Sequence, residues 1–345
     1  MGRKIAVVLF NLGGPDLPED VQPFLQNLFR DPAIINLPGL IREPLAWIIS
    51  KKRAPEAQVN YDKMGGGSPL LPETKKQADA LKAQLQALSP DDEFQIIIAM
   101  RYWHPFVEEA VELVKEFEPD ETVLLPLYPQ FSTTTTGSSL TAWTKAGGGP
   151  ARTICCYPQE GDFIKAHAEL ILKSWKAAGS PEGVRVLFSA HGLPEKIIEA
   201  GDPYQWQVER TVEAVRQYLP AFDDIEICYQ SRVGPLKWIG PSTDECVIRA
   251  SEAGRHILLV PIAFVSEHIE TLVELDEEYY ELAQEHKVLG YTRVPTLSVN
   301  AGYIKALSAL TLEALEGDVG IKPPQGARLC PAHCTQCPAK LDPVA

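Results

Sequence analysis

Long apolar runs are missing from this chain. The longest, Ile257–Val265, has the length of a strand, whereas a helix that crosses a bilayer needs about 20 apolar residues. Basic residues are scarce as well, because 32 Lys and Arg stand against 46 Asp and Glu and leave a net charge of −14. Proteins that bind nucleic acid present a basic face. The sequence therefore predicts a globular protein that neither spans a membrane nor binds nucleic acid.

Cysteine is sparse and its number is odd. Of seven cysteines, three lie together near the C-terminus, so a framework of disulfide bonds is not expected. No G-x-G-x-x-G follows an expected strand, which argues against a dinucleotide site. The first apolar run, Ile5–Phe10, lacks a small-residue cleavage site after it and predicts a first strand rather than a signal peptide. We expect a protein of a reducing, cytoplasmic compartment.

Short apolar runs alternate with long amphipathic stretches along most of the chain. The runs are continuous and rich in Val, Ile and Leu, as in parallel strands that are covered on both faces. This alternation predicts an α/β protein with doubly wound architecture, in two similar halves of four parallel strands each. The expected strands are Lys4–Leu12, Phe94–Arg101, Glu121–Tyr128, Arg152–Pro158, Val184–Ser189, Ile225–Gln230, His256–Phe264 and Thr296–Val299.

The turn-forming segment Ala178–Gly183 is the expected linker between the halves. It divides the chain into an N-terminal domain of residues 1–177 and a C-terminal domain of residues 178–300. Residues 301–345 then form a last helix and a cysteine-rich tail, which a Pro-rich stretch from Gly317 to Gln325 separates from that helix.

Residues 25–53, here called the lip, depart from the alternation of strands and helices. Aliphatic and aromatic side chains are dense between Leu25 and Trp47, prolines interrupt them, and the basic cluster Lys51–Arg53 follows. One interpretation is a loop and a helix packed on the core. The other is an apolar cover over a flat hydrophobic ligand, able to touch a membrane surface.

Polar side chains follow the carboxyl ends of several expected strands, where ligands bind in open α/β sheets. Arg101–Pro105 follows a strand of the first half, and His191 and Ser266–Glu270 follow strands of the second. A histidine at such a position can simply hold a turn. Its place among other polar strand ends favours function, because a neutral imidazole accepts a proton or binds a metal near neutral pH.

Four glutamates are spaced to share one face of a helix, at Glu267, Glu270, Glu274 and Glu278. Such a stripe is usually a solvated surface. This one begins directly after an apolar strand, and no Lys or Arg lies between residues 256 and 286 to pair with it. Stacked carboxylates can pass protons or a hard divalent cation along a line.

Several segments together resemble the ferrochelatase family, whose members insert ferrous iron into protoporphyrin to make haem. They include Gly65-Gly-Gly-Ser-Pro, Arg101-Tyr-Trp-His-Pro, Ser189-Ala-His-Gly-Leu-Pro and Gln230-Ser-Arg-Val-Gly-Pro, and the similarity extends from Asn11 to Glu278. The resemblance implies two similar Rossmann-like domains of the chelatase type, with protoporphyrin IX in the cleft between them and ferrous iron as the second substrate.

The resemblance also implies roles for individual residues. His191 and Glu270 match the catalytic metal-site pair, and Glu274 and Glu278 continue an acidic path from it. The residues that match the porphyrin pocket or its mouth are Leu12, Lys52, Arg53, Tyr61, Ser68, Arg101 and Tyr102. Iron insertion removes protons from pyrrole nitrogens, so the site needs a base. His191 is the expected proton acceptor and Glu270 the expected iron contact, although the two roles can be exchanged.

Three cysteines of the tail have C-x3-C-x2-C spacing, at Cys330, Cys334 and Cys337. Such thiols can hold an iron–sulfur cluster or zinc. The tail resembles that of cluster-bearing ferrochelatases, which implies a 2Fe-2S cofactor. The chain departs from the animal pattern, because Thr133 stands at that pattern's internal ligand position. Cys155 or Cys156 is the expected fourth ligand, with His333 as a stand-in, and the alternatives are zinc or a flexible tail without metal.

The residues leave other functions open. A coproporphyrin ferrochelatase or a cobalt chelatase would have the same fold. A porphyrin or haem carrier would need the pocket but not the row of glutamates, and a redox protein would use the tail as its working centre. A homodimer and peripheral contact with the inner membrane are also left open.

Overall fold

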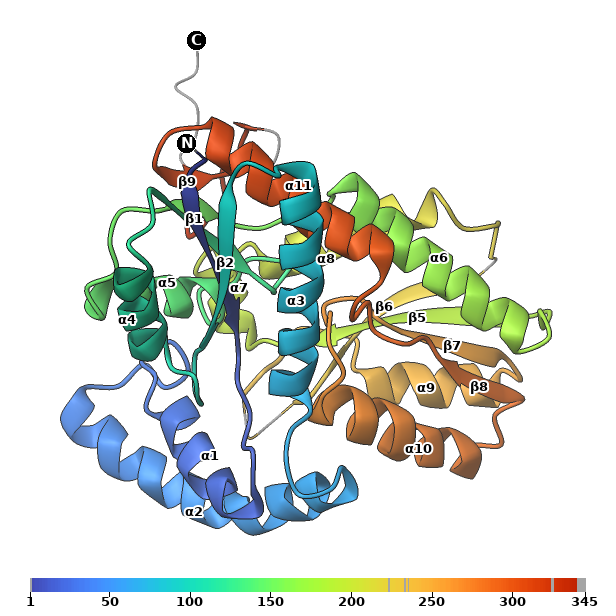
Figure 1. The fold of residues 1–345 in the computed structure, drawn as a ribbon. Helices are drawn as coiled ribbons and strands as arrows, with labels where there is room; N and C mark the ends of the chain where they lie inside the picture. The colour runs from blue at the N-terminus through green and yellow to red at the C-terminus, as the bar shows by residue number, and fades with distance from the viewer. Residues whose placement is uncertain (1, 223, 233, 235, 324–325, 340–345) are drawn as a thin grey trace. The chain divides into compact units, whose positions relative to one another are not determined.

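The computed structural model of the chain describes residues 2–222, 224–232, 234, 236–323 and 326–339. The chain forms two compact units (Figure 1). Unit 1 comprises Met1–Cys156 and Leu307–Arg328, and unit 2 comprises Tyr157–Ala306 and Leu329–Ala345. Helix α11 (Ala301–Glu316) therefore begins in unit 2 and ends in unit 1. This division differs from the expected boundary after residue 177, because α6 (Gly161–Ala177) belongs to unit 2.

Within the described residues, unit 1 is built on a five-stranded sheet with the order β2-β1-β3-β4-β9, and every pair in it is parallel. Its strands are β1 (Lys4–Asn11), β2 (Glu93–Met100), β3 (Glu121–Pro126), β4 (Arg152–Ile154) and β9 (Gly320–Lys322). Its helices are η1 (Pro18–Asp20), α1 (Val21–Phe29), α2 (Gly39–Lys63), α3 (Leu70–Leu88), α4 (Val107–Phe117) and α5 (Thr136–Lys145).

The apolar run of β1 explains its place inside this sheet. Ile5–Phe10 have no exposed surface, because neighbouring strands cover both edges and helices cover both faces. Figure 1 shows α4 and α5 on one side of the sheet and α3 on the other, with α1 and α2 beyond the carboxyl end of β1. The segments that follow β1 and β2 therefore lie at the end where ligands bind in such sheets.

The sheet of unit 2 has four parallel strands in the described part of the chain, in the order β6-β5-β7-β8. Its strands are β5 (Val184–His191), β6 (Asp224–Gln230), β7 (His256–Pro261) and β8 (Gly290–Arg293). Its other helices are α7 (Glu195–Glu199), α8 (Tyr204–Arg216), α9 (Thr243–Glu252), the π-helix η2 (Glu270–Glu278) and α10 (Tyr279–Glu285). Figure 1 shows α6 on one face of the sheet and α9 and α10 on the other.

The expected α/β class with two parallel sheets is confirmed, but two strands differ from expectation. The predicted strand Thr296–Val299 is wrong, because these residues form a loop in which Ser298 N–H donates to Val265 O. The last strand of unit 2 is instead β8. Its sequence, Gly-Tyr-Thr-Arg, contains no aliphatic run that would predict a strand. Strand β9 was not expected either, since it has only three residues in a Pro-rich stretch, and it makes the sheet of unit 1 five-stranded.

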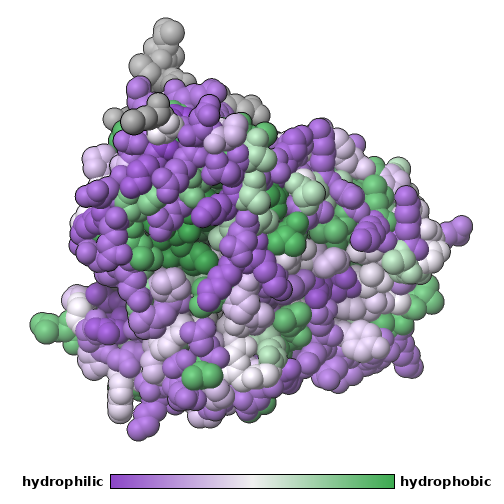
Figure 2. Space-filling model, in the orientation of Figure 1, coloured by the Kyte–Doolittle hydropathy of each residue, from purple (hydrophilic) through white to green (hydrophobic). Residues whose placement is uncertain are grey.

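The lip consists of the end of α1, the loop that follows it and the first half of α2. Its apolar side chains are not all buried. Leu40 at the start of α2 is 95% exposed, and Ile41, Trp47 and Ile48 are exposed as well. Figure 2 shows hydrophobic side chains projecting at the left edge of the molecule, where Figure 1 draws the first turns of α2. Only part of the lip therefore packs on the core of unit 1, through residues such as Phe29 and Ala46.

Candidate active site

A histidine and a glutamate of unit 2 meet at the carboxyl end of its sheet. His191 is the last residue of β5, and Glu270 is the first residue of η2. Nδ1 of His191 lies 2.8 Å from Oε2 of Glu270. The side chains are 39% and 19% exposed, respectively, so both can be reached by a ligand. The structure thus brings together the two residues that the sequence predicts as a pair.

Each member of this pair changes the proton affinity of the other. Burial by itself would lower the pKa of His191, but the charge and hydrogen bond of Glu270 raise it above its usual value. Burial would likewise raise the pKa of Glu270, but the imidazole lowers it to about 2. The partly exposed position of His191 makes the carboxylate the deciding influence. The contact therefore favours the imidazolium of His191 together with the carboxylate of Glu270.

Glu274, one turn along η2, has a pKa that is shifted in the opposite direction from the pKa of Glu270. Its Oε2 accepts hydrogen bonds from Gln230 Nε2 and Ser231 Oγ, both at 2.6 Å. Burial, and then the negative charge of Glu270, raise its pKa to about 7. A carboxyl group with this pKa can take up and release a proton at neutral pH. Glu278 ends η2 and is exposed, so the row of glutamates runs from the partly exposed pair to the surface.

The acidic row lies on a π-helix rather than on the helix of ordinary pitch that the spacing predicts. Short π-helical segments, with i→i+5 hydrogen bonds, are frequent at functional sites. Glu267 precedes η2 and does not continue the row. Its Oε1 accepts a hydrogen bond from Arg293 Nη1 at 2.7 Å, and Arg293 Nε donates to Asp276 Oδ1 at 2.7 Å. Glu267 therefore belongs to an ion-pair cluster with an arginine beyond the acidic stretch.

Two residues that contact the acidic row were not predicted as site residues from the sequence. His268 Nε2 lies 4.0 Å from Glu270 Oε1, which places Glu270 between two imidazoles. Gln230 ends β6, and its Oε1 accepts a hydrogen bond from Ser189 Oγ at 2.8 Å while its Nε2 binds Glu274. Both residues lie at or after the end of an expected strand, and this position could have identified them as candidates. Only the folded chain shows which carboxylate each one contacts.

Unit 1 contains all the residues expected to bind porphyrin. Arg101 directly follows β2, and its Nη2 lies 2.9 Å from Oδ2 of Asp31. Arg101 Nε donates to Ser138 Oγ at 2.6 Å. Tyr102 is fully buried, and its hydroxyl donates to Asp31 Oδ2 at 2.7 Å. Asp31 was not predicted as a site residue, because a lone acid in an apolar segment carries no local signal.

The Gly13-Gly14 turn brings Leu12 and Ser68 to the same end of the sheet. Leu12 O accepts the Tyr102 N–H at 2.9 Å. A Cβ atom on Gly14 would lie 2.6 Å from the side chain of Ser68, so the close approach of these two loops requires glycine there. Tyr61 is buried at the end of α2. Lys52 is exposed, and the Arg53 guanidinium lies 5.8 Å from the centre of the Phe29 ring.

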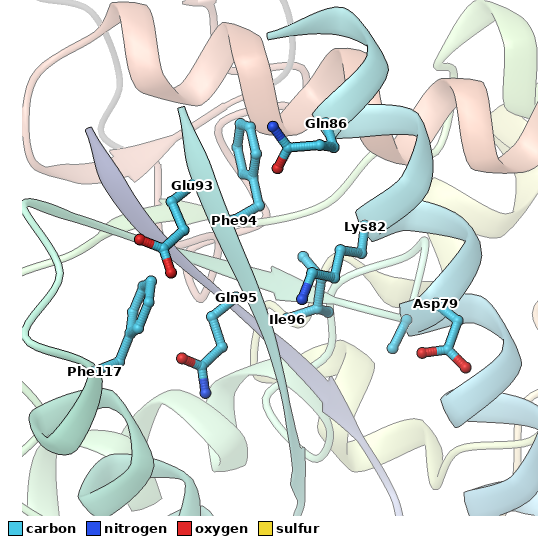
Figure 3. Close-up of a pocket in the computed structure, with 9 residues that line it drawn as sticks. Asp79, Lys82, Gln86, Glu93, Phe94, Gln95, Ile96 and Phe117 are labelled. Carbon is cyan, nitrogen blue, oxygen red and sulfur yellow. The ribbon is translucent and has the colours of Figure 1, made fainter. Parts of the chain in front are cut away.

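A surface hollow of unit 1 lies apart from these residues. It has a volume of about 470 Å³ and is lined by α3, Phe117 and the amino-terminal half of β2. Figure 3 shows Asp79, Lys82 and Gln86 along one side of it and Glu93 and Gln95 along the other. Arg101 follows the opposite, carboxyl end of β2. Because this hollow contains none of the predicted site residues, it is not a candidate for the porphyrin site.

The three tail cysteines are close neighbours in unit 2. A hydrogen bond with Cys337, followed by burial, raises the pKa of the Cys330 thiol. Gln207 Nε2 donates to Cys330 Sγ at 3.1 Å. Cys155 and Cys156 are buried residues of unit 1, with their Sγ atoms 3.5 Å apart. In the described residues, no group of three or more His, Cys, Asp or Glu side chains has the geometry of a metal site.

The length and hydropathy of the helices also bear on membrane contact. Among the described residues, none of the helices combines the length and the apolar character needed to cross a bilayer.

Comparisons with known proteins agree with one another. The family profile described as Ferrochelatase matches residues 4–315. A ferrochelatase of Hyphomonas neptunium is 58% identical over 340 residues, which cover 98% of this chain and 95% of the relative. A ferrochelatase of Caulobacter vibrioides is 56% identical over 346 residues, which cover 99% of each chain.

Solved structures resemble the chain in fold. SirB from Bacillus subtilis, solved with Fe³⁺, has a TM-score of 0.50 at 12% identity and covers 90% of this chain and 95% of its own. CbiX, described as the terminal enzyme of sirohaem biosynthesis in denitrifying bacteria, has a TM-score of 0.50 at 14% identity, with coverages of 90% and 99%.

Proposed function

Because the chain belongs to the ferrochelatase family, we propose that it inserts ferrous iron into protoporphyrin IX and so forms protohaem. The observation that carries this proposal is the contact of 2.8 Å between His191 and Glu270, at the head of a row of glutamates. Iron insertion requires a contact for a divalent cation and an acceptor for pyrrole protons. The two side chains supply these two functions side by side.

The electrostatics of the pair suggest an order of events. The positive charge of a ferrous ion that approaches Glu270 stabilises the carboxylate. The same charge repels the imidazolium of His191 and so lowers the pKa of His191. His191 then loses its proton and becomes free to accept one from the porphyrin. Glu274, with a pKa of about 7, is the next acceptor, and the exposed Glu278 returns protons to solvent. His191 is thus the proposed proton acceptor and Glu270 the proposed iron contact.

An anaerobic assay with ferrous iron and protoporphyrin IX tests this function, by following the loss of porphyrin fluorescence. We expect Glu270→Gln to lower kcat by about 100-fold, the scale of one lost acid–base or metal contact, with porphyrin binding retained. A wild-type protein that binds porphyrin without turnover would be a carrier. Faster turnover of coproporphyrin, or of cobalt in place of iron, would identify the related chelatases instead.

We further propose that Cys330, Cys334 and Cys337 of unit 2 are ligands of a 2Fe-2S cluster. The proximity of the thiols and the amide donor Gln207 support this, because N–H donors stabilise thiolate ligands. Such a cluster supplies one-electron redox chemistry when bound. Visible absorption of anaerobically purified protein, lost on replacing the three tail cysteines by serine, is the expected result. Bound zinc, or a colourless metal-free protein, would contradict it.

The exposed part of the lip supports a proposal of peripheral membrane contact. Leu40, Ile41 and Ile48 are exposed and lie close in the sequence to the exposed, basic Lys51 and Lys52. This combination favours anionic lipid surfaces. We expect the protein to sediment with anionic vesicles, and Leu40→Ser with Ile41→Ser to reduce the bound fraction. If sedimentation equilibrium instead shows a dimer that these substitutions dissociate, the surface is a subunit interface.

A further inference from the structure

The lip contains one buried carboxylate. Asp31, two residues after the end of α1, is 4% exposed, although its neighbours in the sequence are largely apolar. A carboxylate removed from water is costly unless hydrogen bonds and an opposite charge compensate for the lost solvation. The contacts of Asp31 therefore show what the folded chain uses this group for.

Donors from several segments of unit 1 converge on this carboxylate. Oδ2 accepts hydrogen bonds from the Tyr102 hydroxyl at 2.7 Å and from the Ser138 hydroxyl, and it lies 2.9 Å from Arg101 Nη2. Oδ1 accepts the Ala33 N–H at 2.8 Å. Asp31 thus fastens the lip to the segment after β2 and to helix α5.

The same contacts orient the guanidinium of Arg101. Its Nε donates to Ser138 Oγ at 2.6 Å, and its Nη2 faces Asp31. Because the guanidinium is planar, fixing these two nitrogens fixes the direction of the third. The Arg101 side chain remains 23% exposed. Its Nη1 end is therefore held in one orientation, and an Arg held in this way forms strong, directional hydrogen bonds with a carboxylate.

We propose that Asp31 is a positioning residue, which holds Arg101 ready to bind a carboxylate of the porphyrin and couples that contact to the placement of the lip. This inference rests on the proposed function and on the place of Arg101 in the porphyrin site. Asp31 itself does not touch the substrate. Tyr102, with its hydroxyl on the same carboxylate, is a second support of Arg101.

Steady-state kinetics of Asp31→Asn test this role, because the amide keeps the shape of the side chain and removes its charge. We expect KM for protoporphyrin IX to rise about tenfold with kcat changed less than about threefold, since a ground-state contact is weakened. The rise should disappear with the porphyrin dimethyl ester, which has no carboxylate to bind. In the Arg101→Gln background, Asp31→Asn should add no further effect.

Asp92→Asn is the matched control. It breaks another Arg–Asp pair of unit 1, in which Arg3 Nη2 lies 2.7 Å from Asp92 Oδ2 at the amino ends of the strands, and it should leave KM unchanged. If Asp31→Asn does not fold, Ser138→Ala replaces it, because it removes the Arg101 Nε partner and keeps the carboxylate. The expected rise in KM is then smaller, about threefold.

The outcomes separate the inference from the proposals on which it rests. A raised KM in Arg101→Gln with a wild-type KM in Asp31→Asn overturns the positioning role. An equal rise with the acid and the ester substrates also overturns it, because the loss is then not specific to a carboxylate. A wild-type KM in Arg101→Gln instead removes Arg101 from the porphyrin site, and a wild-type protein without iron insertion refutes the proposed function.

Discussion

His191 and Glu270 illustrate how neighbours decide the chemistry of single residues. A carboxylate 2.8 Å from the imidazole of His191 favours the charged form of that ring and raises its pKa. Burial, and then the charge of the same carboxylate, raise the pKa of the next acid of the row, Glu274, to about 7. Residues of ordinary type thus acquire unequal proton affinities over a short distance, which is what a path for protons requires.

Replacing Glu270 by Gln should lower the pKa of His191. Burial then has no opposing charge of comparable size, and it disfavours the imidazolium. NMR titration of the imidazole C–H signals measures the change. Glu278→Gln, at the exposed end of η2, is the control and should leave the signal of His191 where it was. An unchanged His191 titration in Glu270→Gln would show that the pair is not electrostatically coupled.

Replacing Glu274 by Gln should stabilise the protein at pH 8 but not at pH 5. The folded state holds the Glu274 proton up to a pKa of about 7, against an ordinary value of 4.5. The stability that the protonated Glu274 contributes is therefore complete when the pH is below the ordinary pKa. It is lost as the pH rises through the pKa of the folded state. We expect a gain of about 1–2 kcal/mol in the free energy of unfolding at pH 8, somewhat less than the full shift implies.

Urea unfolding of both proteins at the two pH values measures this difference. Parallel dependence of stability on pH in the two proteins would mean that Glu274 titrates normally.

Among the elements, the turn between α7 and α8 leaves no room for a side chain at one of its residues. Gly201 has a φ of +97°, and a Cβ atom there would lie 2.2 Å from Thr335 Oγ1 and 2.8 Å from Thr335 N. The tail docks on this turn through Gln336 N–H, which donates to Gly201 O at 3.0 Å. A helix-connecting turn thus determines where the cysteine segment of unit 2 can lie.

Gly201→Ala should release the cysteine tail from unit 2. The backbone strain is about 1–2 kcal/mol, and the clash with Thr335 adds to it. Limited proteolysis should then cut the tail faster than in the wild type. Gly254→Ala is the matched control, because Gly254 also has a positive φ, +63°, but no atom within 4 Å of the added Cβ. Equal rates of tail cleavage in the two variants would contradict the predicted role of the contact.

At the scale of the whole molecule, the C-terminal segment contributes to both units. After α11 it adds β9 to the sheet of unit 1 and then supplies the cysteine tail of unit 2. Gly320 N–H donates to Ala151 O at 3.0 Å and Cys155 N–H to Lys322 O at 3.3 Å. Strand β4 has only three residues, so this pairing protects an otherwise exposed edge.

Ending the chain after Glu316 should therefore expose the backbone of β4. We expect hydrogen exchange at Cys155 and its neighbours to accelerate, because their partner strand is gone. The central strand β1, whose partners β2 and β3 remain, is the internal control and should keep its protection. Unchanged exchange in β4 would show that β9 does not hold that edge.

Much of this organisation could be predicted from the sequence, because it depends on local patterns. Continuous Val, Ile and Leu runs located most of the strands from β1 to β7, and the polar residues at or beyond the carboxyl ends of β5 and β7 pointed to His191 and Glu270. Those features follow from side-chain periodicity and from the geometry of parallel sheets. Strands β8 and β9 escaped prediction because they are short and half-buried, with no aliphatic run.

Only the tertiary structure decided how the charged groups are paired. Asp31 meets Arg101, Arg293 meets Glu267, and Gln230 meets Glu274 across long stretches of sequence. The spacing of the glutamates likewise did not predict that η2 is a π-helix. The physical reason is that buried charges are stable only with specific partners. The fold selects those partners by bringing together segments that are remote along the chain.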